Sequence, residues 1–447
     1  MSRSLKLSLF VLLCTTLPAF GQIPALNSKP GAAYNLYLDY GGFTFTGTWG
    51  ISYDPSPLPP PSASLAYGGT TAQMTEIWTR TAEKYSAFNL NVTTVDPAVA
   101  AGQAGTNAIR QAYYDNTAQM MHTIVANTDG SWISAGGVSY QGVTRTSWAT
   151  AGLNGGAGAG MHTNWVFPNF LGGNGALQTI AEAAAHENGH GLKLDHQSRY
   201  IPSFNEYDSG TGTGVGSVAP IMGNSYDAER GTWRVGQSSV SSTTIQNDVQ
   251  TLLSNTNLGT FVDSAIGHTR PTATPLPLTG ATINSSSAKG IITPVSATAP
   301  IAIGAANYTK DFFSFTVTAG NTGTINVVLR SGRSTITAGT ADPGATLNAT
   351  FLLLNSSGTA IVLSSAGVFT ETINQSNLAA GTYYLEIDSA GGTTDANGNT
   401  YFDMGSYFIT GSFTLTPVPE PVTVLAVAVL GLGLVRTGRR HWANLAA

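Results

Sequence analysis

The chain has 447 residues, of which only 10% are charged and 52 are glycine, and its formal net charge is −5. This length predicts two to three domains, and the low charge with many turn-forming residues favours a β-rich extracellular protein over a helical cytosolic one. No basic stripe lies in the interior of the sequence, so we expect no nucleic-acid partner.

Residues 1–21 have the pattern of a secretory signal peptide. Two basic residues precede an apolar run from Leu7 to Leu13, and Ala19 and Gly21 supply the small residues that a signal peptidase requires. We therefore expect cleavage before Gln22 and a secreted or cell-surface protein. Because the only cysteine, Cys14, lies in this segment, metal ligands of the mature chain must be histidines or carboxylates.

A first globular block is expected over residues 32–265. Alternating and amphipathic patterns predict strand, helix and strand in its first part, and a long helix ends at the richest histidine cluster of the chain. A further helix closes the block. In chain order, we expect strands at Tyr34–Tyr40, Phe88–Val95 and Ala135–Val143, and helices at Thr75–Tyr85, Ala176–His190 and Ser242–Leu253.

The decisive motif runs from His186 to His196. His186 and His190 are four residues apart on the predicted helix and therefore share one face, with Glu187 beside them. Gly191 can end the helix, after which the chain can turn back and present His196 as a third ligand. Three imidazoles and an open position favour a catalytic zinc ion, with Glu187 as the general base. The alternative is a polar helix end with solvated histidines.

This stretch resembles the metzincin (reprolysin-like) zinc peptidases, whose third histidine also follows the second by six residues. Ala219-Pro220-Ile221-Met222-Gly223 looks like the Met-turn of that family, so Met222 would form an apolar floor beneath the metal. There are departures from the family pattern. Lys193 stands where the family has a glycine, so we expect a different local turn, and Tyr226 lies too far past Met222 for a catalytic role.

The resemblance implies an α+β zincin or metzincin-like catalytic domain, and strand patterns later in the chain predict an all-β sandwich domain after it. It also implies hydrolysis of protein or peptide substrates. Zinc lowers the pKa of bound water to about 7 and polarises the scissile carbonyl, while Glu187 takes the water proton and can pass it to the leaving amine.

Other candidate ligands are weaker. His122 and His162 lack ligand spacing and are expected in the core or at the surface. Asp395 to Asn399, near Asp403, is rich in carboxylate and amide oxygens, but the segment lacks the glycine and glutamate of an EF-hand. The sequence leaves open a Ca²⁺ site of another kind or a polar turn.

A second block is expected over residues 272–417, after a Pro- and Thr-rich linker. Short β-branched and aromatic runs bounded by turn residues predict a β-sandwich. The block resembles the bacterial pre-peptidase C-terminal domain at residues 311–315, 352–358 and 379–384, which implies a role in targeting or substrate contact. We expect strands at Phe312–Val317, Thr324–Leu329, Ala349–Leu354, Tyr383–Ile387 and Tyr407–Leu415.

Residues 418–441 form a second sorting feature. Val418-Pro419-Glu420-Pro421 leads into a 14-residue apolar run, Val422–Val435, and then into arginines. As a helix this run would be about 21 Å long, shorter than the roughly 30 Å bilayer core. It resembles the bacterial PEP-CTERM sorting signal, which implies transient membrane anchoring and association with an exopolysaccharide matrix. An ordinary short membrane anchor is the alternative.

The sequence thus favours a secreted or surface-sorted zinc endopeptidase. The alternative from another class is a non-catalytic matrix or adhesion protein with a structural or vestigial metal site. Glu187 argues against that alternative, because a structural site needs no base. A zinc hydrolase that acts on something other than peptides is a third reading.

Overall fold

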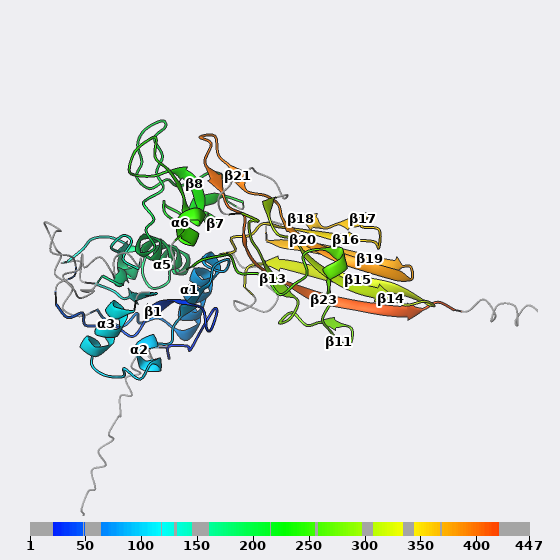
Figure 1. The fold of residues 1–447 in the computed structure, drawn as a ribbon, viewed down its shortest axis with the longest axis horizontal. Coiled ribbons are helices and arrows are strands. Elements are labelled where there is room, and N and C mark those ends of the chain that lie inside the picture. The colour runs from blue at the N-terminus through cyan, green and yellow to red at the C-terminus, as the bar shows by residue number, and fades with distance from the viewer. Residues whose placement is uncertain are drawn as a thin grey trace, which may run out of the picture.

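The computed structural model places the chain in two lobes (Figure 1). The N-terminal lobe contains the longer helices, and the C-terminal lobe is built of long strands. The expected signal peptide and most of the sorting signal, including its apolar run, lie outside the described residues. The described residues are 21–47, 49, 64–117, 119–128, 132–144, 161–214, 216–254, 258–296, 307–333, 344–366 and 369–419.

The molecule is mostly β: 36% of it is strand and 17% is helix. The expected fold class, an α+β metzincin-like catalytic domain before an all-β sandwich, is therefore wrong. The physical reason is that much of the sequence between the periodic helices forms short strands and bridges, whose two- to four-residue patterns are too brief to identify in a sequence.

A five-stranded sheet forms the base of the N-terminal lobe, in the order β2-β1-β3-β5-β4. Four strands are parallel and almost wholly buried, and β4 pairs antiparallel with β5 at the edge. The strands are β1 (Tyr34–Asp39), β2 (Leu90–Thr93), β3 (Met120–Val125), β4 (Gly137–Val138) and β5 (Thr163–Val166).

Helices α1 (Thr71–Lys84) and α5 (Leu177–Gly191) pack against each other in the core. Thr70 begins α1 with a capping box, since its hydroxyl accepts from the Gln73 amide. Small alanines on α5 permit a close approach, and the Tyr85 hydroxyl donates to the Ala185 carbonyl at 2.8 Å. Both expected helices are confirmed. Shorter helices are α2 (Pro97–Ala100), α3 (Asn107–Asn116), η1 (Pro168–Phe170) and η2 (Arg270–Thr272).

The expected helix at Ser242–Leu253 is wrong in its first half. Ile245–Asn247 is strand β9, which pairs with β8 (Arg234–Gln237), and α6 covers Asp248–Ser254. Ile245 is 60% exposed, so its place in the helical period was fortuitous. Two further short strands, β6 (Val218–Pro220) and β7 (Arg230–Thr232), pair in parallel beside the histidine cluster.

The C-terminal lobe is a pair of sheets with an apolar core between them. Phe315 of one sheet meets Phe413 of the other, with ring centroids 4.7 Å apart. All five strands expected here are confirmed. One sheet contains β10 (Thr274–Pro275), β14 (Asp311–Val317), β20 (Gly381–Ser389), β16 (Ala349–Leu354) and β17 (Ala360–Leu363); the other contains β11 (Leu278–Thr279), β12 (Thr282–Ile283), β13 (Lys289–Ile292), β23 (Gly405–Pro417), β15 (Asn321–Ser331), β19 (Thr370–Leu378) and β18 (Ser365–Ala366).

A hairpin of the C-terminal lobe joins the N-terminal lobe. It consists of β21 (Thr393–Thr394) and β22 (Thr400–Tyr401), and β22 pairs with β8 to give the sheet β21-β22-β8-β9. In Figure 1 this hairpin rises beside β8. Buried polar contacts cross the same junction: Arg230 pairs with Asp403 at 2.9 Å, and Glu83 accepts from the Ser406 amide at 2.9 Å. The two lobes are therefore connected by backbone pairing and buried charge.

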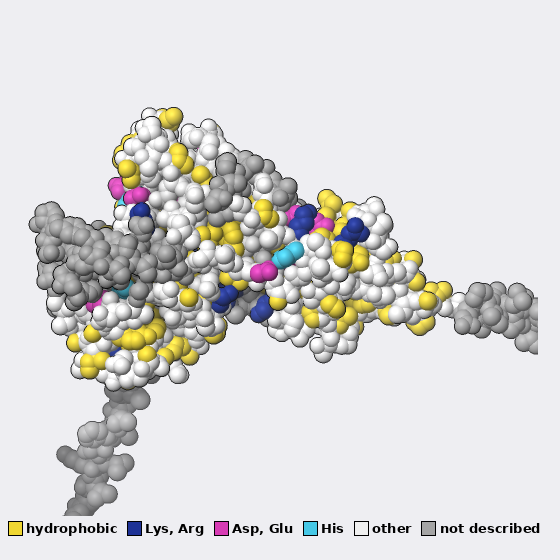
Figure 2. All heavy atoms as spheres, viewed as in Figure 1, with side chains coloured by type: hydrophobic (Ala, Val, Ile, Leu, Met, Phe, Trp, Pro, Cys, Tyr) yellow, Lys and Arg dark blue, Asp and Glu magenta, His cyan; other side chains and the backbone are white. Residues whose placement is uncertain are grey.

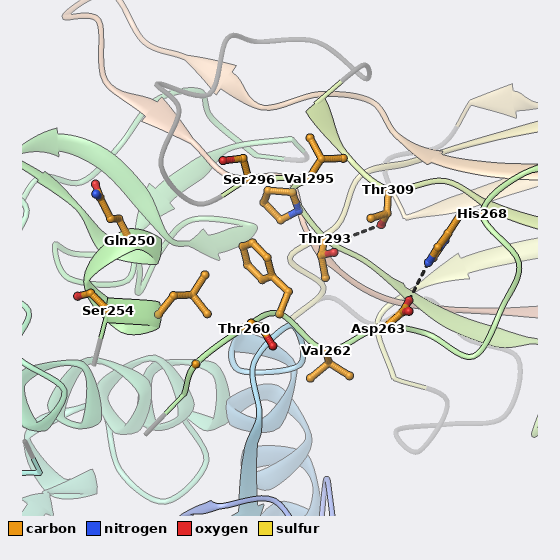
Figure 3. Close-up of a pocket in the computed structure, with 14 residues that line it drawn as sticks. Gln250, Ser254, Thr260, Val262, Asp263, His268, Thr293, Val295, Ser296 and Thr309 are labelled. Carbon is orange, nitrogen blue, oxygen red and sulfur yellow. Dashed lines mark hydrogen bonds and ion pairs between the residues drawn. The ribbon is translucent and has the colours of Figure 1, made fainter. Parts of the chain in front are cut away.

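A second contact region surrounds Asp311, which is buried at the start of β14. Its carboxylate accepts from the Ser264 hydroxyl at 2.9 Å and the Tyr407 hydroxyl at 2.6 Å, and lies 3.1 Å from Nδ1 of His268. His268 also bonds Asp263, at the wall of a cavity of about 710 Å³ between α6 and the strands of the C-terminal lobe (Figure 3). Burial raises the pKa of Asp311 to about 6.

The visible surface carries few charges (Figure 2), in keeping with the low charge of the sequence. Within the described ranges, no helix is long and apolar enough to cross a membrane.

Candidate metal centre

Three histidine rings converge at the C-terminal end of α5. His186 and His190 lie one turn apart on the helix, and His196 follows five residues after the helix ends. Nε2 of His190 lies 3.1 Å from Nε2 of His186 and 3.0 Å from Nε2 of His196. Among the described residues, these three make the one group of three or more His, Cys, Asp or Glu side chains that could hold a metal ion.

The other nitrogen of each ring fixes the tautomer. Nδ1 of His186 faces the Ile221 carbonyl, Nδ1 of His190 the Leu194 carbonyl, and Nδ1 of His196 the Glu206 carboxylate, each at 2.8 Å. These acceptors place the ring protons on Nδ1 and leave three Nε2 lone pairs directed at one another. Such lone pairs repel unless a cation lies between them, so the donor set fits a divalent metal.

Burial keeps the two helical histidines neutral. It lowers the pKa of His190 to about 4 and that of His186 well below its ordinary range, and the neighbouring imidazoles contribute in the same direction. A neutral imidazole is the form that binds a metal.

The turn after α5 presents His196. Lys193 adopts a left-handed backbone with φ of 80°, and its amide donates to the His190 carbonyl at 2.7 Å. The Leu194 amide donates to the Gly189 carbonyl at 2.9 Å, which reverses the chain. The turn therefore forms with Lys193 in the left-handed region, at a backbone strain of roughly 1 kcal/mol.

Glu187 lies in the wall of the same pocket, opposite the edge strand β4. A Cβ on Gly137 would lie 2.6 Å from Oε1 of Glu187, so only glycine lets this carboxylate take its place. Burial raises the pKa of Glu187 to about 8. A nearby cation would lower that pKa again, because positive charge favours the carboxylate.

Met222 lies under the helix, fully buried. A Cβ on Gly189 would lie 2.3 Å from its sulfur, so the glycine between the two helical histidines makes room for it. The backbone of the same turn supports the centre on both sides: the Ile221 carbonyl holds His186, and the Met222 carbonyl accepts from the Gln197 amide at 2.7 Å.

Sequence reasoning missed two residues of the centre, Glu206 and Tyr207. Glu206 accepts from His196, and the ring of Tyr207 faces His196 with centroids 4.4 Å apart. Burial raises the pKa of Tyr207. No local pattern in the sequence links residues ten and eleven positions beyond a histidine to its ring. The only hint in the sequence was that a carboxylate, Glu206, follows His196 and could accept a hydrogen bond from a histidine ring.

Arg234 on β8 organises the backbone behind the centre. It is fully buried, and its guanidinium donates to the Gln197 side chain at 2.8 Å and to the Ser198 carbonyl at 3.1 Å, and pairs with Asp208. The guanidinium also contacts the hydroxyl of Tyr401 on β22, at 3.3 Å. The C-terminal lobe thus contributes to the polar network that supports residues 196–198.

The pocket that contains the three histidines is open and measures about 430 Å³. Small residues of the edge strand form one wall, and Asn224 and Tyr226 of the loop after Met222 form another. Tyr226, expected to pack within its loop, lies in this wall, and burial raises its pKa.

The weaker candidates lie elsewhere. His122 is buried between Asp39 and Thr163, and both ring nitrogens of His162 face backbone carbonyls. Oδ1 of Asp395 accepts from the amides of Asn397 and Asn399 within a polar turn, at 2.8 and 2.9 Å.

No protein family model matches the chain, and neither does any curated protein. Part of the chain is similar to the pre-peptidase C-terminal domain of a collagenase from Bacillus anthracis, at 18% identity over 24% of this chain and 76% of that one, with a TM-score of 0.15. Another part is similar to PliG, a periplasmic inhibitor of g-type lysozyme from Aeromonas hydrophila, at 15% identity over 32% and 95%, with a TM-score of 0.17. Scores this low assign neither fold nor function, and the metzincin and PEP-CTERM resemblances have no counterpart here.

Proposed function

We propose that this chain is a zinc-dependent endopeptidase in which His186, His190 and His196 hold the metal and Glu187 is the general base. One observation carries the proposal: all three Nδ1 atoms have acceptors, so three Nε2 lone pairs point at one another beside a buried carboxylate in an open pocket.

The chemistry divides between metal and protein. A bound zinc ion would supply a water of lowered pKa and would polarise the scissile carbonyl. Glu187, held on α5 next to His186, accepts the proton of the attacking water and delivers it to the leaving amine. The rings are kept in orientation by the Ile221 and Leu194 carbonyls and by Glu206.

The motif resemblance to metzincin peptidases supports the choice of peptide substrates. It rests on the three histidines, Glu187 and Met222 beneath Gly189, and it concerns the site alone. The mature protein, by the same reasoning from sequence motifs, is exported from a bacterium, sorted through residues 418–441 with transient membrane anchoring, and associated with an exopolysaccharide matrix.

The test is digestion of casein and a peptide pool by the purified mature protein. We expect cleavage that a chelator abolishes and zinc restores. Glu187→Gln should keep its zinc and its thermal stability yet lose at least 100-fold in turnover, the usual contribution of a general base. Glu76→Gln, at a half-buried carboxylate on α1 that pairs with Arg80, serves as the matched control and should cleave normally.

Bound zinc without chelator-sensitive cleavage would instead favour the matrix or adhesion protein, in which the metal is structural or vestigial. Near-normal turnover by Glu187→Gln would refute the role of that carboxylate. Cleavage of an ester or another non-peptide substrate alone would favour a different zinc hydrolase.

A further inference from the structure

Tyr207 lies in the pocket beside the histidine cluster, on a segment distant in sequence from α5. Its ring centroid is 4.4 Å from that of His196 and 6.2 Å from that of His186. The side chain is 43% exposed and lines the pocket together with Glu187. Its hydroxyl has no hydrogen-bond partner among the described residues, so it is available to a substrate.

The backbone around Tyr207 is fixed on both sides. The Asp208 amide donates to the Gln197 carbonyl at 3.0 Å, and the Asp208 carbonyl accepts from the Asn224 amide at 2.8 Å. The Asp208 carboxylate pairs with the buried Arg234, and the preceding Glu206 bonds His196. A backbone fixed in this way places the Tyr207 ring beside the histidines, and such placement is the preorganisation that electrostatic catalysis needs.

We propose that Tyr207 is a catalytic residue whose hydroxyl donates a hydrogen bond to the oxyanion that develops on the scissile carbonyl. This inference rests on the proposed peptidase function and deepens it. Tyr207 keeps its proton throughout, and no bond is made or broken at its oxygen; a phenol with an ordinary pKa near 10 is a donor at neutral pH.

The second tyrosine of the pocket fits this role less well. Tyr226 is more buried, and its hydroxyl lies 3.4 Å from the position that a Cβ on Gly136 would occupy, towards the edge strand. Within the described part of the chain it makes no ring contact with the three histidines, whereas Tyr207 contacts two of them.

The test compares Tyr207→Phe with wild type in the full mature protein loaded with zinc. We expect kcat/KM to fall roughly 100-fold, the effect of removing one oxyanion donor. The affinity for a phosphinic peptide should fall by a similar factor, because its tetrahedral phosphorus carries an oxygen where the oxyanion forms. Zinc content should remain equal. Binding of the intact substrate peptide, measured by calorimetry in the Glu187→Gln background, should change less than twofold.

Tyr200→Phe is the matched control, since this tyrosine lies in the same segment and its hydroxyl donates to the Ser238 carbonyl instead. It should match wild type in every measurement. Two results would overturn the proposal: unchanged kcat/KM and phosphinic-peptide affinity in Tyr207→Phe, or an equal loss in binding of the intact peptide. If wild type itself fails to cleave while holding zinc, the peptidase function fails, and the role of Tyr207 fails with it.

Discussion

At the scale of single residues, Gly189 illustrates how a helix can be adapted to a site. Glycine inside a helix is destabilising by roughly 0.5–1 kcal/mol relative to alanine. Here an alanine Cβ would lie 2.3 Å from the sulfur of Met222. The position therefore exchanges helix stability for close contact between α5 and the turn that orients His186.

Gly189→Ala should accordingly lower the free energy of unfolding by about 1–3 kcal/mol, the usual cost of overpacking a core. Denaturant unfolding measures this change. Combined with Met222→Ala, which vacates the space, the two losses should be less than additive, because the residues are in contact. An alanine variant more stable than wild type would show that Met222 can move aside freely.

His186 and His190 could be predicted because their spacing reflects a helical period, and His196 because the chain can turn back after Gly191, whereas Glu206 and Tyr207 could not be predicted. These two residues reach His196 through a loop whose position depends on the buried Arg234 and its partners Gln197 and Asp208. Those contacts join segments 26 to 37 residues apart, and no local pattern encodes them.

At the scale of elements, the sequence predicted where α5 ends, but it did not predict which residue after the helix adopts the left-handed conformation. Gly191 suggested where the helix stops, and the helix ends there. The left-handed residue is nevertheless Lys193, because its amide must reach the His190 carbonyl for the chain to turn towards His196.

Lys193→Gly should therefore raise the free energy of unfolding, by up to about 1 kcal/mol, since glycine adopts φ of 80° without strain. Part of the gain is offset by the greater freedom of glycine in the unfolded chain. Thermal or denaturant unfolding of the zinc-loaded protein provides the comparison. A less stable glycine variant would mean that the lysine side chain contributes more than its backbone strain removes.

Elements with long patterns were identified well, as the strands of the C-terminal lobe demonstrate. The Ser242–Leu253 segment failed because apolar residues at helical spacing also occur by chance. Pairing with β8 draws Ile245–Asn247 into a strand, and the buried Asp248, which accepts from the Arg234 amide, marks the start of α6.

At the scale of the whole molecule, the fold class was wrong because it was inferred from a family motif that concerns about a dozen residues. The many short strands and the pairing of β22 with β8 are long-range features, set by contacts between blocks that sequence analysis treats separately.

The cluster around Asp311 predicts a pH dependence of stability. Its pKa is about 6 in the folded protein and 3.8 ordinarily, so the folded state holds the proton more tightly. The stabilisation from this group is fully present below pH 4 and is lost as pH rises through 6, with an upper size of about 3 kcal/mol. His268, whose pKa is also raised, acts in the same direction.

We therefore expect wild type to lose about 2 kcal/mol of unfolding free energy relative to Asp311→Asn between pH 4.5 and 7.5. Denaturant unfolding at the two pH values gives the difference. Between the two pH values, the unfolding free energy of the control Asp227→Asn, at an exposed position, should change by the same amount as that of wild type. The same change in Asp311→Asn as well would mean that the Asp311 carboxylate is ionised throughout this range.

The pairing of β22 with β8 limits where this chain can be divided to make chimeric proteins. A chimera that replaces everything after residue 265 with a foreign module would leave Arg234 and Val235 of β8 without their paired strand. It would also leave Arg230 buried without its counter-ion Asp403. We therefore expect the isolated N-terminal lobe to aggregate when it is fused to another protein, unless the fusion also contains residues 393–403. Residues 393–403 thus belong structurally to both lobes, and a chimera without them would destabilise the N-terminal lobe.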